Sequence, residues 1–175
     1  WQDQDHRGLP PAPPPLHDAS MTTATTLPLV AGTWTLDRAH SAVGFTIRHL
    51  GVSKVRGRFA AFDAELVVGD TLAYTLLTAT VDVASLDTGN PDRDAHVLSA
   101  DILDVTRRPT LAFRSTSITA GGSAFLVDGE LTIGTVTRPL RLDVDFGGIG
   151  SFPVGPRHAG FEARGELRRK DFGID

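Results

Sequence analysis

The 175-residue chain contains no cysteine. Disulfide bridges, thiolate catalysis and cysteine-ligated zinc sites are therefore excluded. The absence of cysteine does not indicate whether the protein works in an oxidising or a reducing compartment. Although 41% of the residues are hydrophobic, no run approaches the roughly 18 uninterrupted apolar residues of a membrane-spanning helix. We therefore expect a water-soluble body.

The start of the chain lacks the apolar segment and small-residue cleavage site of a secretory signal peptide, which predicts a cytoplasmic protein. It carries instead the proline-rich run LPPAPPPL at residues 9–16, which favours polyproline II. Met21 is the only methionine, and its position indicates that residues 1–20 lie upstream of the natural start. We expect residues 1–31 to form a flexible arm, with a proline-motif ligand as the alternative, and residues 32–175 to form one domain.

Positive charge is in deficit: 17 Lys and Arg against 21 Asp and Glu give a net charge of −4. This balance argues against binding along a nucleic-acid backbone. The six histidines, at positions 6, 17, 40, 49, 96 and 158, lack the close pairing of a metal site. No P-loop or dinucleotide-binding glycine motif is present. We expect no metal, no nucleotide cofactor and no nucleic-acid partner.

Alternation of apolar and polar residues is the dominant pattern from residue 34 onward, and it predicts half-buried β-strands. Seven segments show it: residues 43–47, 62–68, 77–83, 111–113, 131–133, 140–146 and 161–167. The turn signals at residues 69–70 and 121–122 favour antiparallel neighbours. The sequence thus predicts an all-β, antiparallel fold of seven or eight strands, and alternation alone does not separate a barrel from a sandwich.

One segment departs from alternation. Asn90 is a suitable N-cap, Pro91 suits the first helical position, and Ala95, Leu98 and Ile102 follow at helical spacing. We predict one short helix there. Residues 147–160 are rich in glycine and proline, so we predict a connection between the last two strands.

Several motifs resemble, in order and spacing, the YceI-like, polyisoprenoid-binding family. They are Trp34, residues 37–45 (DRAHSAVGF), His49, residues 57–59 (GRF), 85–90 (SLDTGN), 93–97 (RDAHV), 101–104 (DILD), Pro109, Phe113, residues 129–139 (GELTIGTVTRP) and 169–173 (RKDFG). The resemblance implies an extended, lipocalin-like antiparallel β-barrel for residues 32–175. It also implies a non-catalytic protein that carries or stores a long amphiphilic lipid, such as an isoprenoid quinone or a prenyl phosphate, inside the barrel.

The chain departs from the family pattern twice. Ile102 and Leu103 stand where the family often has two aromatic residues, which keeps the apolar character and alters the pocket rim. The family also typically continues beyond the DFG segment through one more strand, whereas this chain stops at Asp175. Closure of the barrel is therefore an open question at this point: either a final strand follows residue 175, or another segment covers that edge.

A long isoprenoid needs a deep apolar lining with a few polar groups at one mouth. We expect the inward strand faces to supply this lining: Phe45, Ile47, His49, Phe59, Phe62, Leu66, Leu77, Val81, Phe113, Leu131, Ile133, Leu142, Val144, Phe146 and Phe161. His49 has the parity of Phe45 and Ile47, so it points inward on a regular strand and can bind a head group or serve as a structural histidine. The alternative is that all these side chains fill a closed core.

The candidates for the polar mouth are Arg58, Arg93, Asp94 and His96. Arginine suits bidentate phosphate contact, and residues 48, 54 and 56 add further cations near Arg58. The alternatives are a solvated hairpin for the cations and, for residues 93 and 94, an anchor that holds the helix.

Asp37, His40 and Ser41 resemble a nucleophilic triad in composition only. No Gly-x-Ser-x-Gly elbow is present, and residues so close in sequence do not present one converging site. We expect a structural role for Asp37 and His40 at the start of the first strand.

Three classes of function therefore remain. The leading hypothesis is a lipid carrier that binds an isoprenoid without a cofactor and contacts membranes only transiently. The sequence is compatible with a monomer or a homodimer. The alternatives are an enzyme that acts on an amphiphilic lipid and a filled-core structural or interaction module.

Overall fold

The computed structural model describes residues 26–49, 52–121, 124–151, 153 and 155–175. The strands in this part are β1 (Gly32–Thr35), β2 (Val43–His49), β3 (Ser53–Phe59), β4 (Phe62–Val68), β5 (Leu76–Asp82), β6 (Leu86–Asp87), β7 (Thr110–Gly121), β8 (Ala124–Ile133), β9 (Val136–Ser151) and β10 (Arg157–Arg164). The helical elements are η1 (Arg38–His40), η2 (Leu72–Tyr74), η3 (Val83–Ser85), α1 (Pro91–Leu98) and η4 (Arg169–Phe172).

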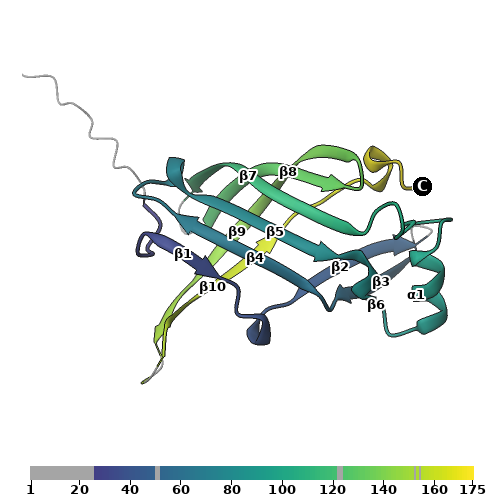
Figure 1. Cartoon of the computed structure of the whole chain (residues 1–175), viewed down its shortest axis with the longest axis horizontal. Helices are drawn as coiled ribbons and strands as arrows, with labels where there is room; N and C mark the ends of the chain where they lie inside the picture. Colours follow the sequence, from purple (N-terminus) through teal and green to yellow (C-terminus); the bar gives the residue numbers. More distant parts are fainter. Residues whose placement is uncertain (1–25, 50–51, 122–123, 152, 154) are drawn as a thin grey trace, which may run out of the picture.

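The strands form two sheets, and every pairing is antiparallel. The larger sheet has seven strands in the order β1-β4-β5-β7-β8-β9-β10, and it curls into a half-barrel (Figure 1). The smaller sheet has the order β2-β3-β6 and lies beside α1 at one end of the molecule (Figure 1). The predicted all-β antiparallel fold with one short helix is confirmed.

The half-barrel has a seam between β1 and β10. These two strands stand at opposite ends of the strand order, and no ladder between them is present in the described part of the chain. One contact links the two sides of this seam: the Asp37 carboxylate, just after β1, lies 3.6 Å from Nδ1 of His158 on β10. The seam is thus bridged by side chains rather than by a continuous backbone ladder.

Alternation explains the inner face of the larger sheet. Along β8, residues 125, 127, 129, 131 and 133 are buried, while the residues between them are more exposed. Because successive strand side chains point to opposite sides, one face packs inward. Gly129 lies in this buried row because the Phe113 ring occupies the space over it: a Cβ at residue 129 would lie 2.4 Å from the ring.

Two sequence predictions about element ends were wrong. Residues 147–160 were predicted to be a connection, but β9 continues to Ser151 and β10 begins at Arg157. Glycine-rich residues can still pair through their backbones, and the ladder absorbs an irregularity between Gly160 and Phe161. The last predicted strand ran to residue 167, whereas β10 ends at Arg164.

The helix begins where the sequence predicted and ends earlier. The Asn90 side chain accepts a hydrogen bond from the backbone N–H of Arg93, and Pro91 follows as the first helical residue. The helix ends at Leu98, so the prediction that extended it to Ile102 was wrong. Asp104 adopts a φ of +48° in the turns that follow, which shows that the chain leaves helical geometry there.

The core extends along the inner face of the larger sheet and is closed by both ends of the described chain. Leu27 and Leu29, which fall in the range predicted for the arm, are buried in this core together with Phe172 and Ile174. The two chain ends lie toward opposite ends of the molecule (Figure 1). The terminal segments therefore cover the two ends of the half-barrel.

Candidate functional site

The candidate site is formed by the apolar faces of the two sheets. In the larger sheet, register places Phe62 opposite Val81 and Val81 opposite Leu111. In the smaller sheet, Phe45 lies opposite Gly57, on the same face as Phe59. Within each sheet, the register thus places these residues on a common face, while the lining of one lipid site by both sets stays a prediction.

Part of the inner face is packed core. Four predicted lining residues are buried in the main cluster: Phe113, Leu131, Ile133 and Val144. Four more pack against that cluster while remaining half-buried: Leu66, Leu77, Leu142 and Phe146. In this part of the half-barrel, the alternative of a filled core describes the side chains well.

The rest of the inner face is less covered. Phe45, Phe59, Phe62 and Val81 are half-buried and lie outside the main core cluster. The rings of Phe45 and Phe59 are 5.3 Å apart between centroids, so they form one aromatic pair on the smaller sheet. We call Phe45, Phe59, Phe62 and Val81 the open apolar row.

Three further predicted lining residues have separate positions. Ile47, near the end of β2, is 36% exposed. Phe161 on β10 is 41% exposed and stacks in a tilted geometry against Phe146, with centroids 5.2 Å apart. His49 ends β2 opposite Ser53, and its side chain lies outside the described part of the structure.

The polar mouth candidates do not converge on one point. Arg58 forms an ion pair with Asp87 at 2.9 Å, across β3 and β6. Arg93 donates hydrogen bonds to the hydroxyl and carbonyl oxygens of Thr88, and the Asp94 carboxylate accepts from the Thr88 N–H and hydroxyl. Both helix residues therefore hold α1 to the end of β6, which matches the anchoring alternative.

His96, the fourth mouth candidate, is exposed on the last turn of α1. Its carbonyl accepts a hydrogen bond from the hydroxyl of Ser99, which closes the helix. No described contact joins the His96 ring to the other three candidates.

Asp37 organises the start of the first strands. Its carboxylate lies 2.9 Å from Nδ1 of His40 and accepts a hydrogen bond from the N–H of Ala39. Ser41 donates its hydroxyl to the Asp37 carbonyl at 2.6 Å, so the hydroxyl is not aligned on the imidazole as a nucleophile. The hydrogen bond from His40 lowers the pKa of Asp37, and the geometry supports a structural role.

Ion pairs on the outer face of the sheets keep several carboxylates charged. The Arg141 guanidinium donates to both oxygens of Asp128 across β9 and β8, which lowers the pKa of that carboxyl. Arg38 likewise lowers the pKa of Asp63. These groups are exposed, so each pair contributes little to stability.

We predict that acid weakens the fold through these pairs. Because the folded-state pKa of Asp128 lies below the ordinary value of about 3.9, its stabilising contribution is present above that value and is lost as the pH falls through the folded pKa. When the pH is lowered below about 4, the urea concentration at the midpoint of unfolding should therefore fall less for Asp128→Asn than for the parent chain. Asp70→Asn, in an exposed turn, is the control, and equal acid profiles for all three proteins would contradict the prediction.

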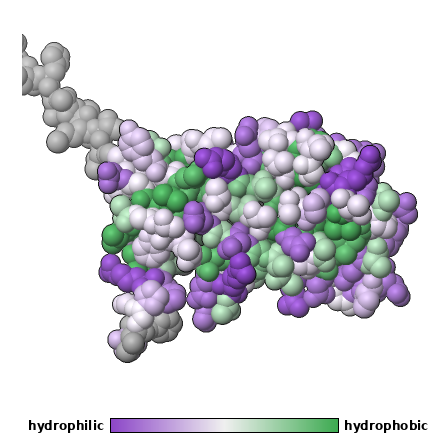
Figure 2. Space-filling model, viewed as in Figure 1, coloured by the Kyte–Doolittle hydropathy of each residue, from purple (hydrophilic) through white to green (hydrophobic). Residues whose placement is uncertain are grey.

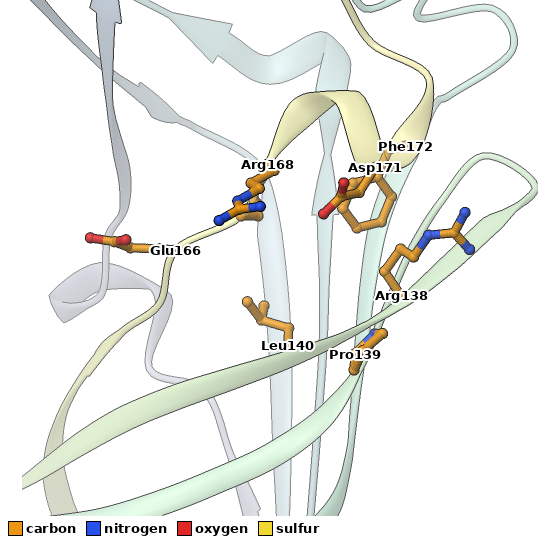
Figure 3. Close-up of a pocket in the computed structure, with 8 residues that line it drawn as sticks. Arg138, Pro139, Leu140, Glu166, Arg168, Asp171 and Phe172 are labelled. Carbon is orange, nitrogen blue, oxygen red and sulfur yellow. The ribbon is translucent and has the colours of Figure 1, made fainter.

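Two hollows on the described surface have linings unlike that of a long-lipid site. The first has a volume of about 190 Å³ and lies between β9 and the C-terminal segment (Figure 3). Its lining is Arg138, Pro139, Leu140, Glu166, Leu167, Arg168, Asp171 and Phe172. It is smaller than typical ligand pockets of roughly 300–1,000 Å³, and charges of both signs line it.

The second hollow has a volume of about 450 Å³, and its lining is Arg38, Ala60, Ala61, Phe62, Asp63, Thr80, Asp82 and Thr110. Phe62, a member of the open apolar row, therefore borders this hollow together with its sequence neighbour Asp63. Its lining mixes the apolar Ala60, Ala61 and Phe62 with the charged Arg38, Asp63 and Asp82, so it is not the continuous apolar lining that an isoprenoid tail needs. The open apolar row therefore remains the candidate site.

The described residues include no group of three or more His, Asp or Glu side chains arranged to hold a metal ion. Among the helices described, none has the length and apolar character to span a bilayer.

Sequence reasoning missed several inner-face residues. Leu111 and Ala79 share the parity of predicted lining residues, and cross-strand register would have added them. Leu27, Leu29, Phe172 and Ile174 left no comparable signal, because they lie outside any alternating strand pattern and become core only when the chain ends fold back.

Comparison with known proteins gives one consistent result. The YceI-like domain family matches residues 34–175. Protein YceI of Shigella flexneri is 37% identical over 148 residues, which cover 83% of this chain and 78% of that protein. A UPF0312 protein of Vibrio cholerae is 38% identical over 138 residues, which cover 78% of this chain and 73% of that protein.

Solved structures agree with this result. The YceI protein of Campylobacter jejuni has a TM-score of 0.64 and 31% identity, covering 81% of this chain and 84% of that one. BcnA of Burkholderia cenocepacia has a TM-score of 0.69 and 26% identity, covering 79% of this chain and 84% of that one. With the family match spanning the curled sheet, the smaller sheet and α1, the chain belongs to the YceI-like family.

Proposed function

We propose that the protein binds one long amphiphilic lipid, an isoprenoid, along the inner face of the half-barrel and carries it without chemical change. The observation that carries the proposal is the open apolar row. Phe45, Phe59, Phe62 and Val81 face the inner side of the two sheets, yet they remain half-buried instead of packing into the main core. Apolar surface left uncovered in this way is typical of a binding site.

The chemistry of the row favours a hydrocarbon tail. Its members offer aromatic and aliphatic surface, and they present no side-chain hydrogen-bond donor. Each five-carbon prenyl unit buried at about 0.8 kcal/mol per CH₂ gains roughly 3–4 kcal/mol before the cost of ordering the chain. A few units are therefore enough for stable binding, and the length of the tail is not fixed by affinity.

The resemblance to the YceI-like, polyisoprenoid-binding family supports this proposal. The motifs that carry the resemblance run from Trp34 to the RKDFG segment at residues 169–173. The ligand would be an isoprenoid quinone or a prenyl phosphate. Its head group would lie outside the row, because the members of the row offer no hydrogen-bonding side chain.

The test is the identity of the lipid that copurifies with the full chain. The protein is purified without detergent, extracted with organic solvent and analysed by mass spectrometry. The expected result is one isoprenoid per chain, recovered unchanged after prolonged incubation with the protein. Multiple turnover of that lipid would favour an enzyme instead.

A second outcome separates binding from a filled-core module. If the folded protein yields no lipid and takes up none from isoprenoid mixed micelles, the inner face is closed in solution. That result would overturn the proposal and favour a structural or interaction role.

A further inference from the structure

The outer face of the smaller sheet carries a concentrated positive charge. Register places Arg48 opposite Lys54, Thr46 opposite Arg56 and Gly44 opposite Arg58. Since opposite residues of antiparallel strands point to the same side, all four cations project from one face, away from Phe45 and Phe59. We call Arg48, Lys54, Arg56 and Arg58 the basic face.

Little negative charge offsets the basic face. Arg58 pairs with Asp87 of β6, while Arg48, Lys54 and Arg56 are exposed and form no ion pair within the described residues. Arg48 and Lys54 are like charges placed directly opposite each other, an arrangement that costs stability unless an anion lies over them. The net charge of the whole chain is −4, so the basic face is a local exception.

An exposed apolar side chain lies at the same hairpin. Val52, which immediately precedes β3, is 92% exposed. In the face that Figure 2 shows, hydrophobic side chains also gather at the end of the molecule where β3 and β6 lie, next to hydrophilic ones. Cations beside exposed aliphatic side chains are the combination that binds the interface of an anionic bilayer.

We propose that the basic face docks the protein on an anionic lipid bilayer, with Val52 entering the head-group region. This inference goes beyond lipid carriage and does not require a bound lipid. Docking would place the smaller sheet, whose opposite face carries Phe45 and Phe59, next to the membrane. Nucleic acid fits less well, because the positions between the cations are Gly44 and Thr46, which offer no aromatic ring for base stacking.

The test measures cosedimentation of the full chain with vesicles of phosphatidylcholine alone and of phosphatidylcholine mixed with phosphatidylglycerol. Binding is expected only to the anionic vesicles, and it should weaken strongly at about 0.5 M salt because the charges are exposed. The triple variant Arg48→Gln, Lys54→Gln, Arg56→Gln should bind on the order of a hundredfold more weakly, from about fivefold per cation.

The matched control removes the same charge elsewhere. Arg114, Arg157 and Arg169 are exposed and lie outside the smaller sheet, so their triple replacement by Gln should leave vesicle binding nearly unchanged. Val52→Asp supplies a second variant that alters the tip of the hairpin and leaves the cations in place, and it should also weaken binding.

Three outcomes would overturn the proposal. They are equal loss of binding in both triple variants, binding that does not depend on phosphatidylglycerol, and preference for a DNA or RNA oligonucleotide over the anionic vesicles. Isoprenoid content, measured on the same variants by mass spectrometry, should stay unchanged, which separates failure of docking from failure of lipid carriage.

Discussion

Affinity for the isoprenoid should fall on the order of a hundredfold when Val81 is replaced by aspartate. Val81 lies on the inner face between its register partners Phe62 and Leu111. A carboxylate there must either lose its water or hold water against the hydrocarbon tail, and both are unfavourable. The measurement is the dissociation constant for the lipid that copurifies with the parent chain, together with the amount retained after purification.

Val67→Asp is the matched control for this experiment. Val67 is also half-buried, but it alternates with Leu66 and Val68 on β4 and so belongs to the outer face. The same new charge should therefore leave lipid binding close to that of the parent chain. If the two variants lose affinity equally while both remain folded, the assignment of the site to the inner face is wrong.

Gly129→Ala should destabilise the domain by about 2–4 kcal/mol, through overpacking of the core. A Cβ at this position would lie 2.4 Å from the Phe113 ring and 2.5 Å from the Arg114 carbonyl oxygen. The ring is buried in the core and the carbonyl belongs to the backbone of β7, so neither moves without disturbing its neighbours. The free energy of unfolding in urea measures the loss.

Gly150→Ala tests whether this effect depends on position. A Cβ at residue 150 meets no atom within 4 Å, so the substitution should change stability by less than about 1 kcal/mol. Adding Phe113→Leu to Gly129→Ala should restore only part of the stability, because the contact with the Arg114 carbonyl remains. A Gly129→Ala protein as stable as the Gly150→Ala protein would refute the close packing described for this site.

The sequence was informative where a local rule decides the structure. Alternation predicted β2, β4 and β5 closely, and the Asn90-Pro91 pair predicted the start of α1. Both patterns depend only on residues close together in the chain, so they can be interpreted without knowledge of the fold. Alternation failed in residues 147–160, where glycines pair through their backbones and leave no side-chain pattern.

The candidate site was predictable in part. Parity assigns Phe62, Val81, Phe113 and Leu131 to inward faces, and the structure places all four there. Parity does not say that Phe113 and Leu131 are packed while Phe62 and Val81 remain half-buried, because that difference depends on which segments fold over them. The Asp37–His158 contact could not be predicted from the sequence for a similar reason, because the two residues come together only when the sheet curls.

The strand order has a consequence for how the chain folds. Strands β7 to β10 are paired with their neighbours in sequence and form a meander. By contrast, β1 pairs with the more distant β4, and the contact across the seam joins Asp37 to β10 near the other end of the chain. Local pairings pay less loop-closure entropy, so they form earlier. We therefore expect the meander to be the folding nucleus, and the burial of Leu27 and Leu29 to be among the last steps.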